Sequence, residues 1–206
     1  FYTLVFARLR ERKIERRERE IESEKRKEIG QQLHKALRDS PPSKIPTLIE
    51  TCRDVLSFAE VHGDLPLHIA CSHGSPLEVV RYLVQEHPES LQVTTNYGTL
   101  PLHVACHYGK LDVIQYLAEA YPESLQATNN DGLIPLDFAI SYGELDIIRY
   151  LVHEYPRSLQ VTGDDGGLPL HFVCLSQAPL EVVRYLVQAC PESLQVTNSH
   201  GNLPLH

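Results

Sequence analysis

Apolar residues recur in the same order along most of the chain, and each round of the pattern takes 34 or 35 residues. Residues 98–131 illustrate one round. Within them, apolar residues fall at helical spacing in 101–108 and again in 111–121, where Leu111 and Ile114 share one face. The pattern predicts two short helices per unit, followed by a short helical turn and an extended loop that leads to the next unit.

Proline and glycine mark the start of each predicted helix pair. Pro101 suits the first position of a helix, where its missing N–H costs nothing. Gly98 lies three residues earlier, and the same spacing recurs in the other units, which predicts a turn with positive φ. Two short helices cannot bury their own apolar stripe, so we expect each unit to stack on its neighbours.

A tetrapeptide opens most units and fixes their register. It reads LPLH at 65–68, 100–103, 168–171 and 203–206, and IPLD at 134–137. The successive units are 30–62, 63–97, 98–131, 132–165 and 166–200, with a partial unit at 201–206. Residues 1–29 precede this array and are expected to form a charged helix or a linker.

Four segments of the array carry a resemblance to a known family, and two of them illustrate it. The stretches LPLHIACSHGSPLEVVRYLV at 65–84 and LPLHVACHYGKLDVIQYLA at 100–118 resemble the ankyrin-repeat signature Thr-Pro-Leu-His-x-Ala-Ala, followed by Gly and then Leu-x-Val-Val-x-x-Leu-Leu. The resemblance covers about 30–206 and implies an all-α solenoid of stacked helix–turn–helix units. Leucine or isoleucine replaces the family's capping threonine, and we expect this side chain to pack on the neighbouring unit instead.

The resemblance implies a protein–protein interaction scaffold that binds its partner through the concave groove and the loop tips. The partner-facing candidates are the variable residues at the tips and at the ends of the first helices: His62, Asp64, His73, Asn96, Tyr97, Thr99, His107, Tyr108, Asn130, Asp131, Tyr142, Asp164 and Asp165. The alternative is that these positions vary because nothing constrains them. The three tyrosines are the stronger candidates, since exposed aromatic rings supply large contact areas.

The sequence offers little that indicates an enzyme. It has no phosphate-binding glycine loop, nucleophile elbow or paired-carboxylate pattern, and GDDGG at 163–167 is the turn of a repeat. We therefore expect no catalysis, no cofactor and no small-molecule substrate. The histidines that recur at one register, His34, His68, His103 and His171, are expected to hydrogen-bond the neighbouring turn.

The recurring His-x-x-Cys pattern indicates core packing rather than a metal site. Each unit supplies one histidine and one cysteine, whereas structural zinc needs four converging ligands. Cys71, Cys106 and Cys174 share one repeat position, and stacked helices about 10 Å apart exceed the Cα separation of about 7 Å that a disulfide tolerates. We predict free thiols and an intracellular, cytoplasmic location.

A charge run occupies residues 8–28, with ten basic and seven acidic residues and a net charge of +3. The rest of the chain has nine basic and twenty acidic residues, a net charge of −11. The near-balanced run argues against nucleic-acid binding, and the charges at Arg10, Arg17 and Glu24 argue against a coiled-coil seam. A solvated helix is the favoured interpretation.

Both ends of the sequence suggest a piece of a longer protein. The apolar stretch FYTLVFA at 1–7, followed by basic residues, leaves open an alternative in which this is the cytoplasmic ankyrin domain of a membrane-tethered protein. At the other end the chain stops just after opening a unit. We expect at least one further unit there, and without it we expect Leu180, Val183 and Leu186 to be uncovered.

Overall fold

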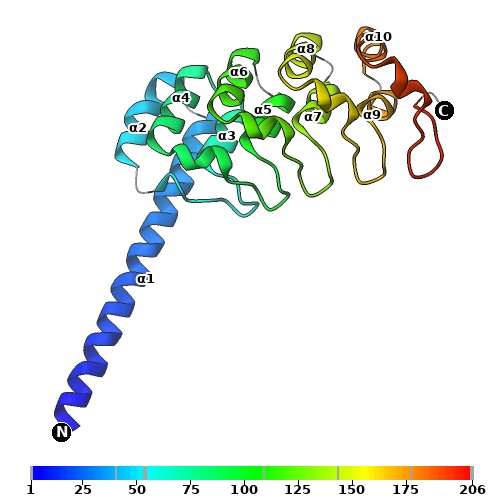
Figure 1. The fold of residues 1–206 in the computed structure, drawn as a ribbon. Coiled ribbons are helices and arrows are strands. Elements are labelled where there is room, and N and C mark those ends of the chain that lie inside the picture. Colours follow the sequence, from blue (N-terminus) through cyan, green and yellow to red (C-terminus); the bar gives the residue numbers. More distant parts are fainter. Residues whose placement is uncertain are drawn as a thin grey trace.

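A long helix leads into a curved row of stacked helix pairs (Figure 1). The computed structural model describes residues 2–39, 41–52, 55–108, 110–142, 144–176 and 178–204, with side chains from Arg16 onwards except those of Glu18 and Pro42. Regular secondary structure in these ranges is helical throughout. The predicted all-α class is therefore confirmed.

Each unit contributes an inner helix, an outer helix and a short 3-10 turn. The long helix is α1 (Tyr2–Asp39), and the inner helices that follow it are α3 (Pro66–Ser72), α5 (Pro101–Tyr108), α7 (Pro135–Tyr142) and α9 (Pro169–Leu175). The outer helices are α2 (Ile45–Thr51), α4 (Leu77–Glu86), α6 (Leu111–Ala120), α8 (Leu145–Glu154) and α10 (Leu180–Ala189). In the units from 63 onwards a 3-10 turn follows the outer helix: η3 (Pro88–Gln92), η4 (Pro122–Gln126), η5 (Pro156–Gln160) and η6 (Pro191–Gln195). In the first unit η1 (Pro42–Lys44) instead precedes the outer helix.

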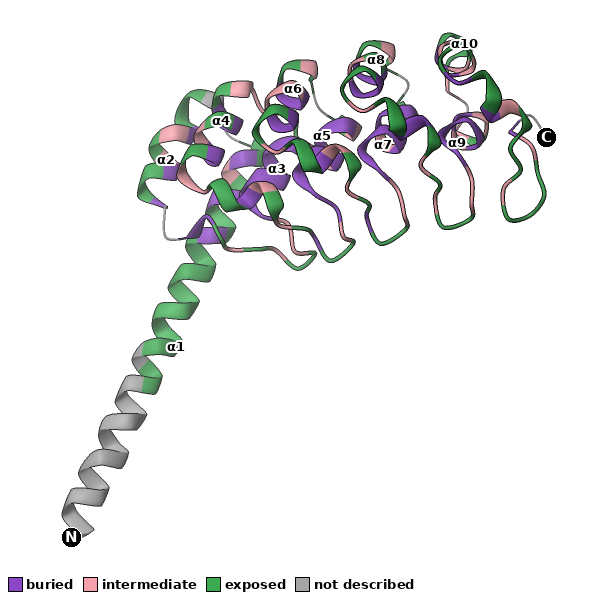
Figure 2. Ribbon diagram, viewed as in Figure 1, coloured by how far each residue is buried: buried purple, intermediate pink, exposed green. Residues whose placement is uncertain are grey.

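The core lies between the inner and outer layers and runs the length of the array (Figure 2). Leu102, Ile114 and Ile148 are each at most 1% exposed, and each comes from the apolar face that the sequence predicts for its helix. The residues in the family's threonine position are buried as well, at 6% exposure or less: Leu65, Leu100, Ile134 and Leu168. Their apolar side chains therefore add to the packing, as expected.

The loops leave the helical layers on the same side of the array (Figure 1). Gly98 stands at the turn of its loop with φ of 73°, and a Cβ there would lie 2.4 Å from Oδ1 of Asn130 and 2.8 Å from its backbone N. The predicted positive-φ turn is present. The same glycine lets the next loop approach closely enough to form hydrogen bonds.

Helix α1 has two parts that differ in burial rather than in backbone. The helix continues through Gly30 without a break, and its last turns take the place of the inner helix in the first unit. Described side chains before Gly30 are exposed, whereas Leu33, His34 and Leu37 are buried. The ring of Phe58 packs where a side chain at position 30 would stand, since a Cβ there would lie 2.3 Å from Cδ1 of that ring.

The last outer helix only partly matches the expectation of an uncovered face. Leu180 is 63% exposed and Val183 is half-buried, whereas Leu186 is 1% exposed. The prediction for Leu186 is wrong, because this residue belongs to the core cluster between the layers and needs no further unit to bury it.

Candidate protein-binding surface

The repeated histidines join each inner helix to the next loop. In His68 the ring accepts a hydrogen bond at Nδ1 from the backbone N–H of Leu65 at 3.2 Å, which fixes the proton on Nε2. That Nε2–H donates to the carbonyl of Thr99 in the next unit at 3.1 Å. His171 repeats both bonds, with the carbonyl of Asn202 in the next unit as acceptor at 3.1 Å. His103 accepts from the N–H of Leu100 in the same way, but its Nε2–H donates to the carbonyl of Ala127, in the loop of its own unit, at 3.1 Å. The predicted structural role is confirmed for these three histidines. His34 differs, because its Nδ1 lies 3.1 Å from the carboxylate of Glu60 in its own unit instead of bonding a neighbouring turn.

Burial disfavours the charged forms of His68, His103 and Asp137. Desolvation lowers the pKa of His103 to about 4 and also lowers that of His68, so both rings are uncharged near neutral pH. Asp137 replaces the histidine in its unit and accepts from the N–H of Ile134 at 3.0 Å. Its pKa is raised to about 6 because burial outweighs that single hydrogen bond. These groups belong to the framework and not to a reactive site.

Asparagines on the loop tips bond to the preceding tip. The side-chain amide of Asn96 donates to the carbonyl of Val61, and that of Asn130 donates to the carbonyl of Asn96, both at 3.0 Å. The backbone N–H of Asn96 donates to the backbone carbonyl of His62 at 2.9 Å, and that of Asn130 donates to the backbone carbonyl of Tyr97 at 3.0 Å. Both asparagines are exposed as predicted, yet their amides already serve the array, so they offer a partner less than the sequence suggests.

Thr99 is a wrong prediction for the exposed set. It is only 9% exposed, because it lies in the segment that returns from the loop tip, where its carbonyl accepts from the backbone N–H of Thr95 and from Nε2–H of His68. Asp64 is half-buried, whereas His62 and His73 are exposed. The acidic candidates Asp131, Asp164 and Asp165 are all exposed on the tips.

Tyr97 and His62 form a small pair on neighbouring tips. Their ring centroids are 6.0 Å apart, and the tyrosine hydroxyl lies 3.5 Å from Nδ1 of the histidine. The tyrosine is 58% exposed. This pair places an accessible aromatic ring at the edge of the loops.

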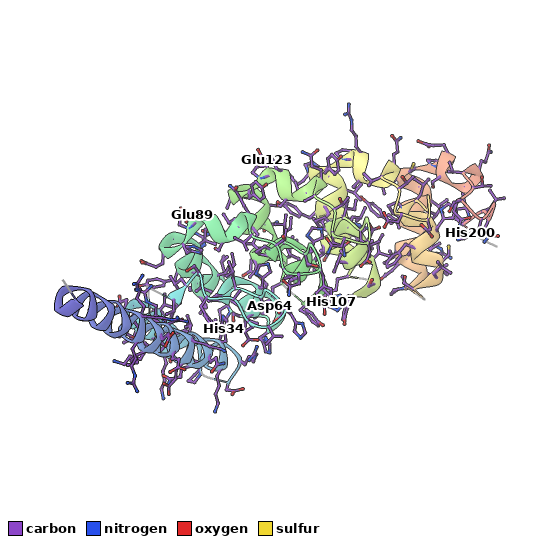
Figure 3. All side chains as sticks on the ribbon, turned by 90° about the horizontal axis from the view of Figure 1, so that it is seen from below. His34, Asp64, Glu89, His107, Glu123 and His200 are labelled. Carbon is purple, nitrogen blue, oxygen red and sulfur yellow. The ribbon has the colours of Figure 1, made fainter. Side chains whose placement is uncertain are left out.

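A second aromatic group, the aromatic cluster, consists of His107, Tyr108 and Tyr142 at the ends of α5 and α7. The half-buried imidazole of His107 lies edge-on to both phenol rings, with centroids 4.0 Å from Tyr108 and 4.1 Å from Tyr142. The two tyrosines are 54% and 55% exposed, and their centroids are 5.8 Å apart. Figure 3 shows His107 on the edge of the array opposite Glu89 and Glu123 of the 3-10 turns.

A hollow of about 190 Å³ adjoins the aromatic cluster. It is lined by Cys106, His107, Tyr108, Tyr142, Glu144 and Ile147. Cys106 and Ile147 are nearly buried, at 2% and 3% exposure, whereas Glu144 is exposed. Neither Glu144 nor Ile147 was among the predicted residues. Glu144 follows α7 and Ile147 lies in α8, and both come close to the end of α5 only when the units stack.

Further apolar side chains are accessible on an inner helix and on a loop tip. Leu175 is 77% exposed at the end of α9, and Val61 is 89% exposed on a loop tip. Phe138 is half-buried with its centroid 6.2 Å from that of His107. Val104 and Phe172 are apolar residues at the repeat position of Phe138. This recurrence is the sequence signal that could have identified Phe138 as part of the surface.

Other kinds of site find no support in the part of the chain that is described. No three His, Cys, Asp or Glu side chains gather there as ligands for a metal ion. All five cysteines lie in this part and are free thiols, and burial raises the pKa of Cys71 to about 12. No helix found there combines the length and apolarity needed to cross a membrane. The alternative of a membrane tether was based on residues 1–7, whose side chains lie outside the described ones.

Comparisons with known proteins agree with the repeat geometry. The family model described as ankyrin repeats (3 copies) matches residues 33–126 and 67–162, which together make up more than half of the chain. A search of curated proteins gives no match. Ankyrin repeats are generally protein–protein interaction modules and typically non-catalytic. On the matched residues, the helix pairs and the histidine bonds between units, the chain belongs to the ankyrin-repeat family.

Proposed function

We propose that this chain is a non-catalytic scaffold that binds a protein partner through the concave groove and the loop tips of its array. The observation that carries the proposal is the aromatic cluster, in which Tyr108 and Tyr142 stand side by side and more than half exposed. Tyrosines held in place by neighbouring rings lose little entropy on binding and often dominate binding energy at interfaces.

The contrast between repeated and variable positions supports this proposal. Most buried positions carry the same residue type from unit to unit, and so do many exposed positions of the 3-10 turns, such as Gln92 and Gln126. The ends of the inner helices differ, with Ser72 and Leu175 in the register of His107. Variation at the ends of the inner helices is typical of a surface that selects a partner.

The free, buried thiols favour a reducing compartment, and we place the function in the cytoplasm on that ground. Cys71 and Cys106 are 1% and 2% exposed and serve as small core residues rather than as disulfide partners. The bound partner is accordingly an intracellular protein.

The test is a selection of binding peptides followed by paired variants. Twelve-residue peptides chosen from a random library against the full chain are measured against the variant Tyr108→Ala/Tyr142→Ala. We expect at least a tenfold loss of affinity, as for the removal of central aromatic contacts. The control Glu89→Ala/Glu123→Ala changes two exposed residues on the opposite edge and should alter affinity less than twofold.

Two outcomes would contradict the proposal. One is repeated selection that yields no binding peptide. The other is a set of peptides whose affinity depends on Glu89 and Glu123 but not on the two tyrosines.

A further inference from the structure

We propose that the aromatic cluster and its hollow bind a cationic side chain, an arginine in an extended segment of the protein partner. The inference rests on the proposed function and adds the chemistry of the residue that the partner inserts. It follows from the geometry of the rings, from the charge at the hollow and from contacts that the chain already makes elsewhere.

The rings form two walls of a wedge. The planes of Tyr108 and Tyr142 are tilted by 52° with centroids 5.8 Å apart, and the imidazole of His107 closes the space between them. Aromatic faces attract a cation within about 6 Å of the ring centroid, tyrosine more strongly than an aliphatic side chain of similar size. A cation in the adjoining hollow meets both phenol rings.

The charge at the hollow favours a positive ligand. Glu144 is the charged residue among those that line it, beside an apolar floor of Cys106 and Ile147. Burial lowers the pKa of His107, so its ring stays neutral near pH 7 and does not repel a cation. Lys110 is exposed two residues after Tyr108 but does not line the hollow.

Other classes of side chain fit less well. An anionic group would meet Glu144, and the chain outside residues 8–28 carries a net charge of −11. A purely apolar group would cover the carboxylate without compensating it, which costs free energy. A guanidinium satisfies the carboxylate and stacks on the rings at the same time.

Arginine–tyrosine stacking already occurs between units of this array. The guanidinium of Arg81 lies 4.9 Å from the ring centroid of Tyr116 in the next unit, and that of Arg149 lies 5.6 Å from that of Tyr185. Both contacts join neighbouring outer helices. The aromatic cluster offers comparable rings at the ends of α5 and α7. Among the described side chains no arginine stacks on these rings, which leaves them open to an arginine of another molecule.

The experiment uses the peptides selected against the full chain. Each arginine is replaced by citrulline, which keeps the shape of the side chain and removes its charge. On the protein side, Tyr142→Leu removes the aromatic face, Tyr142→Phe keeps it, and Glu144→Gln removes the charge. Tyr97→Leu is the matched control, an exposed tyrosine that does not line the hollow.

We expect one arginine of the peptide to be critical. Its replacement by citrulline should weaken binding about 2- to 30-fold, the range of cation–π contributions. Tyr142→Leu and Glu144→Gln should weaken binding to a similar extent, and with the citrulline peptide neither should cause a further loss, because the coupled partner is already missing. Tyr142→Phe should stay within twofold, and Tyr97→Leu should not change the effect of citrulline.

Several results would overturn the inference. If the selected peptides require Tyr108 and Tyr142 but tolerate citrulline at every arginine, the proposed function stands and the cation-binding role fails. If Tyr142→Leu instead reduces self-association in sedimentation velocity, the occupant is the basic segment of a second copy and not a partner. If no peptide binding depends on the tyrosines at all, the proposed function fails as well.

Discussion

Asp137 is the one exception to the histidine register in the units from 63 onwards, and replacing it by histidine tests how the units are joined. The carboxylate is 7% exposed and accepts one hydrogen bond, from the N–H of Ile134 at 3.0 Å. A histidine there should accept the same bond at Nδ1 and donate from Nε2 to a carbonyl of the next loop, as His68 and His171 do. We expect Asp137→His to stabilise the array at neutral pH.

The magnitude has two parts. One buried hydrogen bond between neutral groups contributes about 1 kcal/mol. The rise in the carboxyl pKa from 3.8 to about 6 means that folding disfavours the ionised carboxylate by about 3 kcal/mol. Replacing the aspartate by histidine removes this cost. The free energy of unfolding at pH 7.5 should therefore rise by roughly 1–4 kcal/mol.

The two side chains have opposite pH dependence. A carboxyl with a raised folded pKa stabilises most below its unfolded value of 3.8, and its contribution is lost as the pH rises towards about 6. A histidine with a lowered folded pKa, as His103 has at about 4, contributes fully above 6.5 and loses its contribution as the pH falls towards 4. The advantage of Asp137→His should thus shrink or reverse at pH 5.

Urea unfolding at pH 7.5 and pH 5 measures both effects, provided that the m-value is unchanged. Asp137→Asn is the control, because it removes the charge and should recover the electrostatic part without the bond between units. A variant that is no more stable than the wild type at pH 7.5, or equally stabilised at both pH values, would refute the role assigned to the histidines.

Three further substitutions or probes test the packing. Gly30→Ala should destabilise by about 1–3 kcal/mol in urea unfolding despite the better helix propensity of alanine, because its Cβ would overlap the ring of Phe58; a gain in stability would contradict this contact. Gly98→Ala should cost a similar amount in thermal unfolding, because φ is 73° and the Cβ would meet Asn130, and an unchanged melting temperature would count against the loop geometry. The thiol of Cys106 should react with Ellman's reagent only after unfolding, since burial leaves it 2% exposed and raises its pKa; rapid reaction in the native state would show an open core.

The sequence predicted the fold well because its signals are local and repeated. A proline at the start of a helix, a positive-φ glycine and a helical stripe each act within a few residues, and the copies agree. Gly30 shows the limit of such signals. Glycine usually weakens a helix, yet here the helix continues because the ring of Phe58, far along the chain, occupies the space beside it.

The candidate surface was predicted less well because exposure depends on contacts between units. Thr99 and Tyr97 are two residues apart on one loop, but the first is buried in the turn and the second is 58% exposed. The amide of Asn96 is used by the preceding tip, which no pattern within one unit reveals. The aromatic cluster likewise arises only when equivalent positions of adjacent units, occupied by Tyr108 and Tyr142, are stacked together.

The most direct test of the central claim is to map a bound peptide on the full chain by NMR. The claim predicts that a selected peptide shifts the amide signals of Tyr97, Tyr108 and Tyr142 and their neighbours, while those of Glu89 and Glu123 on the opposite edge stay unchanged. Shifts confined to the outer helices and 3-10 turns, with the aromatic cluster unaffected, would contradict it.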